Sequence, residues 1–378
     1  MGEGYESGIV QGIEDLLRWY DLHHRALPWR EMQDNPYAVW ISEIMLQQTQ
    51  VKTVIPYFIQ WMKHYPTIAS LASAKMEDVL ASWSGLGYYA RARNAHLAAQ
   101  GIMSRHGGEF PVDRDEIIRL PGIGENTRGA ILSIAFNLPE PLVDANVHRV
   151  FSRLTRLPYA IASSSGGKAV WASAKRWMDA GQCFSEFSPR NWNQALMELG
   201  ALICTPSDPD CSHCPISLAC EALKDGNPTQ WPVPRESVKI VHTRHCSLIL
   251  EKNGRFLLIQ RPPAGLWGGL WEFPRAECEE GETPMDCASR LAKDWFDIDP
   301  FQGEERVKVI HGVMHFRISL HAFMVSISPE SLINRHKSSS EWLLPDEICR
   351  KPLSSPQKKL VASLFLRENA SNHLSLAE

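Results

Sequence analysis

Hydrophobic and polar positions divide the chain into two parts with different periodicities. Before about residue 225, apolar residues recur at helical spacing, most clearly over 35–62, 113–120 and 125–136. Beyond it, the pattern predicts strands at 241–250, 255–259, 307–310 and 317–325, and a helix at 287–296. We therefore predict a multidomain protein in which an all-α domain precedes a mixed α and β domain.

A proline-spaced segment separates the two patterns. Residues 225–235 contain Asp-Gly-Asn-Pro and then Trp-Pro-Val-Pro-Arg, and closely spaced prolines oppose helix formation. We predict a helical domain over 1–225, a linker over 226–243 and a second domain over 244–367.

Composition and charge limit the classes of protein that fit. A chain of 378 residues points to two or three domains, and 44% hydrophobic with 22% charged residues is typical of globular proteins. The net charge of -4 argues against binding nucleic acid by bulk attraction, although Lys and Arg outnumber Asp and Glu over 84–176. No apolar stretch reaches the ~20 residues of a membrane span, and Glu3 and Glu6 stand where a signal peptide is basic. We expect a cytoplasmic, nucleoid-associated protein without a signal peptide.

Four of the nine cysteines form one cluster. Cys204, Cys211, Cys214 and Cys220 follow the spacing C-x6-C-x2-C-x5-C, which suits a 4Fe-4S cluster or a tetrahedral metal ion. Structural zinc sites tend to have two Cys-x2-Cys pairs and this segment has one, so the spacing favours 4Fe-4S and leaves zinc as the alternative. The other five cysteines are not spaced as metal ligands, and we interpret them as ordinary small apolar residues: Cys183, Cys246, Cys278, Cys287 and Cys349.

A glycine hairpin and an aspartate mark a second candidate site. Residues 120–124 read Leu-Pro-Gly-Ile-Gly between two predicted helices, and Gly122 and Gly124 could turn backbone N–H groups toward a phosphate. A plain turn is the alternative. About twenty residues later, Val-Asp-Ala-Asn-Val-His-Arg places Asp144 at a helix N-cap, a position that alone predicts only a cap.

These segments, with the four-cysteine loop, resemble the helix-hairpin-helix DNA glycosylases that carry an iron-sulfur cluster, the endonuclease III and MutY group. The match covers residues 16–220 in order. It implies an all-α glycosylase domain with one 4Fe-4S cluster, a monomer and a double-stranded DNA partner. Lyase members carry a lysine two residues after the second hairpin glycine, and Asn126 stands there. An amide cannot form a Schiff base, so a monofunctional glycosylase is implied.

Residues 40–49, Trp-Ile-Ser-Glu-Ile-Met-Leu-Gln-Gln-Thr, resemble the adenine glycosylase signature and supply Glu43. Hydrolysis of an N-glycosidic bond needs a proton on the leaving base and a stabilised sugar cation. Beside Trp40 and Ile44, Glu43 could keep a raised pKa and protonate adenine N7, while Asp144 stays ionised and faces the sugar. A surface helix residue is the alternative for Glu43.

The same resemblance assigns residues to base recognition, since an enzyme must flip adenine out of the duplex to reach it. Gln48 and Tyr88 match wedges near the orphaned base, which Thr49 and Leu86 would also touch. Positions that line the adenine pocket in relatives are occupied by Arg30 and Gln194. A core aromatic is the alternative for Tyr88.

Residues 260–274 resemble the substrate-binding strand and loop of the Nudix, or MutT-like, fold. The helix expected to hold magnesium, near 287–294, lacks the paired glutamates of a working hydrolase. The resemblance implies an α/β Nudix-like domain that recognises 8-oxoguanine, with an inert domain as the alternative. Three features depart from the family: Val313, Met314 and His315 replace a common Phe-Ser-His, Asn126 replaces a tyrosine or serine that assists Asp144, and Ala145 replaces a glycine.

The combined expectation is a base-excision repair hydrolase that releases adenine opposite 8-oxoguanine or guanine. One rival is an endonuclease III-like pyrimidine glycosylase, against which Asn126 and the second domain both count. Another is a catalytically dead lesion-binding protein, which the presence of Glu43 and Asp144 disfavours.

Overall fold

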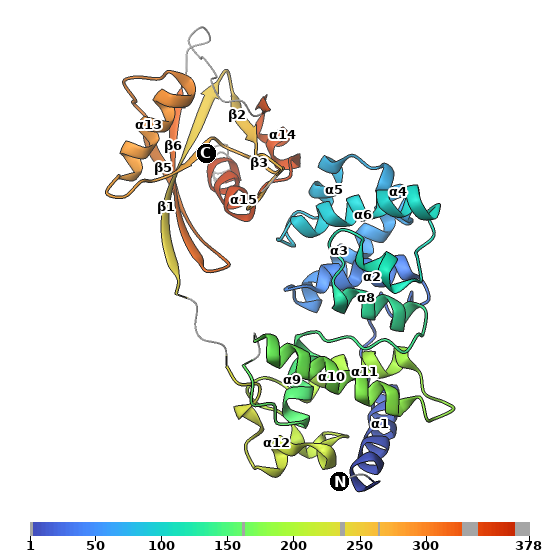
Figure 1. Cartoon of the computed structure of the whole chain (residues 1–378). Helices are drawn as coiled ribbons and strands as arrows, with labels where there is room; N and C mark the ends of the chain where they lie inside the picture. Colours follow the sequence, from blue (N-terminus) through green and yellow to red (C-terminus); the bar gives the residue numbers. More distant parts are fainter. Residues whose placement is uncertain (1–2, 161–162, 235–238, 264, 327–338, 367–378) are drawn as a thin grey trace, which may run out of the picture. The chain divides into compact units, whose positions relative to one another are not determined.

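The computed structural model describes residues 3–160, 163–234, 239–263, 265–326 and 339–366. The chain forms two compact units (Figure 1). The first comprises residues 1–73 and 94–236, and the second comprises residues 74–93 and 237–378. Each unit is described by itself.

The first unit is helical, as the apolar periodicity predicts. In Figure 1, α11 (Pro189–Leu202) lies beside both α1 (Glu3–His23) and α9 (Ala145–Leu154). The aromatic core includes the fully buried Trp40, Trp61, Trp177 and Trp192. Its further elements are α2 (Pro36–Leu46), α3 (Val51–His64), α4 (Ile68–Ser73), α6 (Ala90–His106, which begins in the second unit), α7 (Arg114–Ile118), α8 (Glu125–Ala130), η1 (Ile131–Ala135), α10 (Ser164–Gly181), η2 (Cys211–His213), η3 (Ser217–Ala219), α12 (Glu221–Lys224) and η4 (Pro228–Gln230).

Local sequence explains where the helices that carry the site begin. The Asn35 side chain accepts hydrogen bonds from the N–H groups of Tyr37 and Ala38, and Pro36 takes the first position of α2. Asp144 is the N-cap of α9, as the sequence predicts. The continuous helical pattern over 35–62 is interrupted, because Gln47 ends α2 and Gln50 caps α3.

The second unit is built on a mixed sheet, as predicted. The strand order is β3-β2-β1-β6-β5, with β4 paired to β1 and β7 paired to β2. Strands β1 and β6 run parallel at the centre from Val241↔Phe316 to Glu251↔Ser326, and the other pairings are antiparallel. The strands are β1 (Val241–Lys252), β2 (Arg255–Gln260), β3 (Trp271–Glu272), β4 (Arg275–Glu277), β5 (Glu304–Val313), β6 (Phe316–Ser326) and β7 (Ser340–Leu343).

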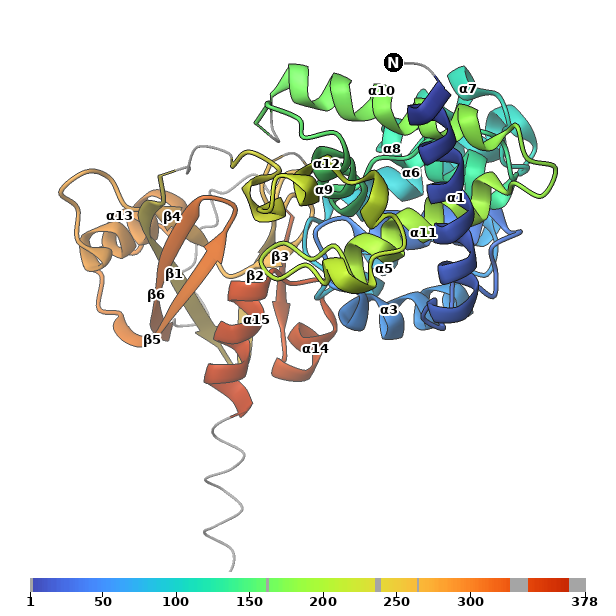
Figure 2. The same ribbon diagram turned by 90° about the horizontal axis from the view of Figure 1, so that it is seen from below.

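Helices cover both faces of this sheet. Figures 1 and 2 show α13 (Pro284–Phe296) and α15 (Ser355–Val361) on opposite sides of the strands. One core joins β1 to α13 through Leu248, Cys287 and Leu291. The other core lies on the opposite face and includes Ile249, Phe273 and Leu360, beside α14 (Pro345–Arg350) and η5 (Ala362–Leu366).

Residues 74–93 belong to the second unit although they lie within the helical part of the sequence. The segment contains α5 (Met76–Ser82). The Tyr89 hydroxyl donates to the Leu353 carbonyl at 2.9 Å, and Trp271 Nε1 and Lys351 Nζ each donate to Glu77 Oε1 at 3.0 Å. These long-range contacts are not visible in the periodicity. Strand β1 also begins at Val241, before the predicted boundary at residue 244.

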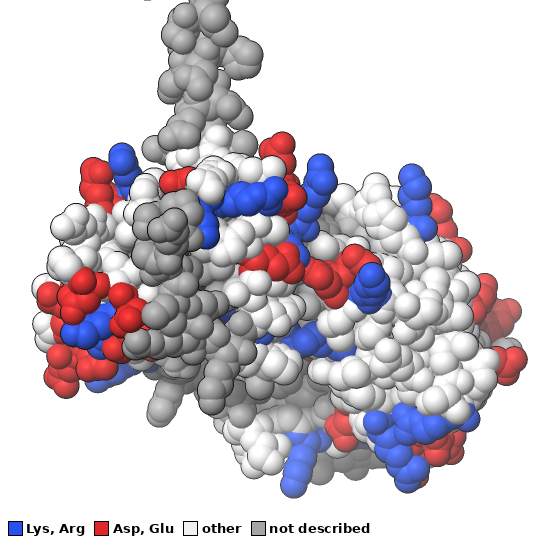
Figure 3. Space-filling model, turned by 90° about the horizontal axis from the view of Figure 1, so that it is seen from above, with Lys and Arg blue, Asp and Glu red and all other residues white. Residues whose placement is uncertain are grey.

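Surface charge follows the nearly balanced composition. On the face drawn in Figure 3, basic side chains lie among acidic ones, with wide uncharged surface between them. Within the described ranges, every helix is too short or too polar to span a bilayer.

Candidate active site

A pocket of about 200 Å³ in the first unit brings together residues from α2, α9 and α11. It collects five residues that the sequence singles out: Arg30, Glu43, Thr49, Asp144 and Gln194. Much of the remaining wall is apolar, so the pocket combines a few polar groups with a hydrophobic lining, as ligand pockets generally do. The other lining residues are Arg25, Leu27, Trp29, Val39, Ser42, Leu46, Val51, Ile134, Asn146, Met197, Glu198 and Ala201.

Glu43 lies on α2, flanked by the buried residues Ser42 and Ile44. Burial raises the pKa of Glu43 to about 8, and the nearby charge of Asp144 adds to this rise. A carboxyl group with this pKa is mostly protonated at neutral pH and can donate a proton. This direction agrees with the raised pKa that the apolar surroundings predict.

Asp144 lies at the start of α9, where both of its carboxyl oxygens accept hydrogen bonds. Its Oδ1 accepts a hydrogen bond from the Val147 N–H at 2.7 Å, and its Oδ2 accepts one from the Asn146 amide at 3.0 Å. Burial raises the pKa of Asp144, while these hydrogen bonds and the charge of Arg149 act in the opposite direction. The two pocket carboxylates therefore differ, because hydrogen bonds oppose the pKa rise at Asp144, whereas the charge of Asp144 adds to the rise at Glu43.

Arg149 connects Asp144 with the cysteine loop. Its guanidinium donates to Asn146 Oδ1 at 2.9 Å and to the carbonyl oxygen of Cys204 at 2.7 Å. A Cβ atom at Gly200 of α11 would lie 2.6 Å from Asn146 Cβ, so glycine allows the close approach of α9 and α11. Packing thus fixes the side chain that orients the Asp144 carboxylate.

Glu198 is a pocket residue that the sequence reasoning did not identify. It accepts two hydrogen bonds from the Arg25 side chain at 2.8 Å and one from Arg30 Nη2 at 2.9 Å. Burial alone would raise the pKa of Glu198, but these bonds outweigh it and lower the pKa to about 2. The sequence feature that could have identified Glu198 is its place on the buried face of an amphipathic helix. Gln194, one turn earlier, donates to Gln33 Oε1 at 3.2 Å.

The glycine hairpin lies outside the pocket lining. Gly122 has φ +78°, and a Cβ atom there would lie 2.7 Å from Asn94 Cβ, so both conformation and space favour glycine. Gly124 is the N-cap of α8. Asn126 does not line the pocket, and its Oδ1 is buried without a hydrogen-bond partner among the described residues.

Both predicted wedge residues adopt a backbone conformation that is uncommon outside glycine. Gln48 in the first unit has φ 55°, and Tyr88 in the second unit has φ 47°. Such strained positions cluster at functional sites. Tyr88 is 46% exposed, so the alternative of a core aromatic does not hold for it. The neighbouring Leu86 is buried, and its carbonyl accepts a hydrogen bond from Arg91.

The four clustered cysteines line one cavity. Arg153 Nη1 donates to Cys204 Sγ at 3.3 Å, and the Cys220 thiol lies 3.7 Å from the Arg153 carbonyl oxygen. Sulfur ligands of a single zinc ion lie about 3.8 Å apart, from a Zn–S distance of about 2.3 Å. Among the described residues, no three of these four sulfurs lie within 4.8 Å of one another. Their wider spacing suits a larger polynuclear group.

The loop predicted to meet 8-oxoguanine is the turn between β5 and β6. Val313 pairs with Phe316, which leaves Met314 and His315 at the tip. Met314 has φ 53° and is 71% exposed. The His315 ring lies against the Phe316 ring, with 4.1 Å between centroids.

Comparisons with known proteins find similarity in both parts of the chain. Residues 41–163 match the HhH-GPD superfamily of base excision DNA repair proteins, and residues 245–363 match the NUDIX domain. The adenine DNA glycosylase of Mus musculus is 32% identical, with 92% of this chain and 76% of that protein covered. The adenine DNA glycosylase of Schizosaccharomyces pombe is 34% identical, with 85% and 83% covered. A solved thermostable thymine-DNA glycosylase is 26% identical with a TM-score of 0.52, and 59% of this chain and 100% of that chain are covered.

Proposed function

Because the chain belongs to the adenine DNA glycosylase family, we propose that its Glu43 and Asp144 pocket releases adenine from pairs with 8-oxoguanine or guanine. The observation that carries the proposal is the meeting of two carboxyl groups with different pKa environments in one base-sized pocket. The family acts in base excision repair, and DNA is its substrate.

In the proposed reaction, protonated Glu43 donates its proton to N7 of adenine as the N-glycosidic bond breaks. Asp144 faces the oxocarbenium-like sugar and stabilises its positive charge, either as an ion or through a transient covalent bond. Asn146 and Arg149 position Asp144 through the hydrogen bonds described above. Water then completes the hydrolysis at the sugar carbon.

Recognition of the flipped base is assigned to the polar end of the pocket. Arg30, Glu198 and Gln194 offer donors and acceptors to the edge of adenine. We assign Gln48 and Tyr88 to the gap left in the duplex, with Thr49 and Leu86 touching the orphaned base, and Gly122 and Gly124 to a DNA phosphate. Asn126 supplies no amine nucleophile, so we propose a monofunctional enzyme without lyase activity, with Asn126 having at most an assisting role toward Asp144.

Cys204, Cys211, Cys214 and Cys220 are proposed to hold one 4Fe-4S cluster, because all four line one cavity and lie too far apart for a single ion. When bound, the cluster would order the loop that follows α11. We further propose a cytoplasmic monomer that works at the nucleoid, with the glycosylase activity in the first unit, a linker that ends before Val241 and lesion reading by the second unit.

Replacing Cys211 by serine is expected to reduce iron below the roughly four atoms per chain of the intact cube. DNA affinity should fall because the loop loses its order, whereas base preference should stay unchanged because the cysteines lie outside the pocket. Metal analysis and duplex binding test this expectation. Cys183→Ser, an exposed cysteine elsewhere, is the matched control. Full iron content in Cys211→Ser, or zinc in place of iron in the unaltered protein, would overturn the cluster assignment.

Replacing Met314 by serine is expected to raise the preference for 8-oxoguanine over guanine opposite adenine. Met314 is exposed at the β5–β6 turn and cannot make a strong hydrogen bond to a base edge, whereas one good contact is worth about 1–3 kcal/mol. The measurement is the ratio of affinities for the two duplexes, each carrying an uncleavable adenine analogue, at one salt concentration.

Met314→Ala separates the added hydroxyl from the loss of the thioether. If serine leaves the ratio unchanged while His315→Ala lowers it, His315 reads the lesion instead. If none of these changes moves the ratio, the assignment of this turn to lesion recognition is wrong.

Cleavage of labelled duplexes with and without alkali tests the proposed activity. Strand breaks at A:8-oxoG and A:G that require alkali support a monofunctional glycosylase, and A:C serves as a comparison substrate. Direct breaks would indicate a lyase, and tight binding without product would indicate a dead lesion-binding protein.

A further inference from the structure

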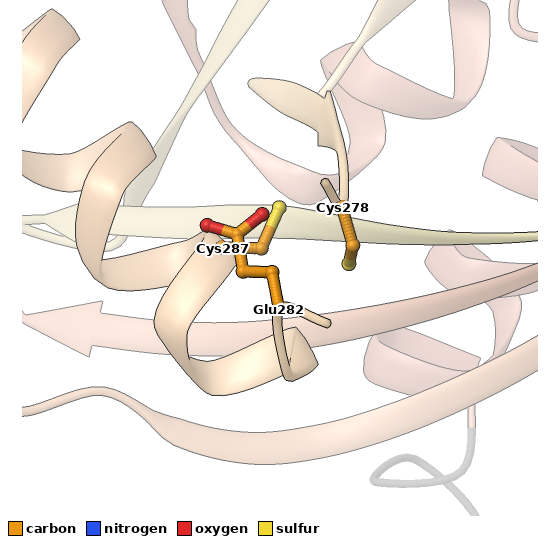
Figure 4. Close-up of side chains that lie close together, drawn as sticks. All are labelled: Cys278, Glu282 and Cys287. Atoms are coloured by element: carbon orange, nitrogen blue, oxygen red, sulfur yellow. The ribbon is translucent and has the colours of Figure 1, made fainter. Parts of the chain in front are cut away.

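Three cysteines of the second unit, Cys246, Cys278 and Cys287, lie close to one another. None of them belongs to the four-cysteine loop of the first unit. Cys246 lies on β1 opposite Ala276 of β4, and the Cys278 N–H donates to the Arg244 carbonyl at 2.8 Å. Since side chains alternate along a strand, Cys246 and Cys278 face the same side of the sheet. Helix α13 packs on that side and contributes Cys287. Figure 4 shows the side chains of Cys278, Glu282 and Cys287 close together, with the Glu282 carboxylate beside the Cys287 sulfur.

The donor atoms have the spacing of ligands to a single metal ion. The sulfurs of Cys278 and Cys287 and a carboxylate oxygen of Glu282 all lie within 4.8 Å of one another. Cys246 Sγ is not part of that group, but it lies 2.9 Å from Cys287 Sγ and is the candidate for a fourth donor. Sulfur ligands of a tetrahedral zinc ion lie about 3.8 Å apart, so the Cys246 and Cys287 sulfurs must separate by about 0.9 Å, and Cys246 must approach the other two donors, for all four to bind one ion. Among the described residues, the 4.8 Å spacing therefore holds for Cys278, Glu282 and Cys287, and it does not hold for any three of the first four cysteines.

The surroundings suit a closed site with soft ligands. Cys246 and Cys287 are fully buried, while Cys278 is half-buried and gives access from the surface. Thiolates select soft or borderline ions such as zinc rather than magnesium. The loop between Cys278 and Cys287 also carries Glu279 and Glu280, whose charges attract a cation.

Arg290 is compatible with a bound ion. It donates to Glu282 Oε1 at 2.9 Å and to Oε2 at 2.8 Å, and its Nη2 lies 3.8 Å from Cys287 Sγ. A carboxylate has about four lone-pair sites, so these bonds leave room for a metal. Three thiolates and a carboxylate exceed the charge of a divalent ion, and the guanidinium reduces that excess. Hydrogen-bonded carboxylate ligands of this kind are usual around protein metals.

We propose that Cys246, Cys278, Cys287 and Glu282 bind one zinc ion in the second unit. The three thiols lose their protons to solvent as the ion enters. The ion ties β1 to the start of α13 and to the polar loop before it. Its role is structural, and it is independent of adenine release in the first unit.

Metal content of the full chain, purified under reductant and dialysed against a chelator, tests the site. We expect about one zinc per chain beside the roughly four irons of the proposed cluster. Cys278→Ser and Cys287→Ser should lose the zinc and keep the iron, whereas Cys349→Ser, an exposed cysteine of the same unit, should keep both. Glu282→Gln should release zinc faster to a colorimetric chelator.

Measuring iron together with zinc distinguishes this proposal from the proposed 4Fe-4S cluster. Zinc bound in the four-cysteine loop would replace iron there, whereas zinc bound at the second site would leave the iron content full. Zinc that stays bound in Cys278→Ser would overturn the site. The site would also be overturned if protein with its full iron content took up no zinc after incubation with zinc chloride and reductant.

Discussion

Glu43→Gln is expected to slow adenine release by about 10²- to 10⁴-fold, the usual cost of losing a general acid. The amide has the same shape as the protonated carboxyl group but cannot transfer a proton to the leaving base. Glu43 is the pocket group whose pKa, near 8, keeps it protonated at neutral pH. Single-turnover release from an A:8-oxoG duplex measures the effect.

DNA binding should survive this change, because the substitution alters one side chain inside the pocket. Glu186→Gln, an exposed glutamate of the same unit, is the matched control and should react at the unaltered rate. A Glu43→Gln protein that releases adenine nearly as fast as the unaltered protein would remove Glu43 from the mechanism.

Asp144→Asn is expected to reduce adenine release by at least about 10²-fold, on the scale of removing one electrostatic contact to a charged transition state. Asparagine is as good an N-cap as aspartate, so its side-chain oxygen can still accept from the Val147 N–H and keep α9 in place. The variant therefore keeps the cap and removes the negative charge, together with the hydrogen bond that Asp144 Oδ2 accepts from the Asn146 amide. The readouts are single-turnover release and thermal unfolding.

Asp113→Asn is a closely matched control. Asp113 is the N-cap of α7 and accepts hydrogen bonds from the N–H groups of Asp115 and Glu116, but it lies outside the pocket lining. Its substitution should leave adenine release unchanged. If Asp144→Asn lost activity only in proportion to lost folding stability, Asp144 would be a structural cap rather than a catalytic anion.

Periodicity and local signals predicted the elements that depend on neighbouring residues. The strands at 241–250 and 317–325 were predicted because long alternating stretches define them, and they form the parallel centre of the sheet. The N-cap role of Asp144 was also local. In contrast, β3 has two residues and exists only through its pairing with β2, so its own sequence carried too little signal.

The missed site features depend on contacts between distant segments. Glu198 meets Arg25 and Arg30 across more than 160 positions, and in sequence it is one glutamate of an amphipathic helix. Cys246 lies far in sequence from Cys278 and Cys287, so spacing indicated no common site for the three. The sheet register and the packing of α13 bring them together.

The pH dependence of single-turnover adenine release tests the proposed acid catalysis most directly. Only protonated Glu43 can donate, so the rate constant for the unaltered protein should be level below the Glu43 pKa of about 8, down to the pH at which Asp144, whose own pKa is raised by burial, takes up a proton. Above that pH it should fall about tenfold per pH unit, as the carboxyl group loses its proton. Glu43→Gln should lack this fall. A rate constant that rises through pH 8, or the same falling profile in Glu43→Gln, would contradict Glu43 as the acid that drives adenine from DNA.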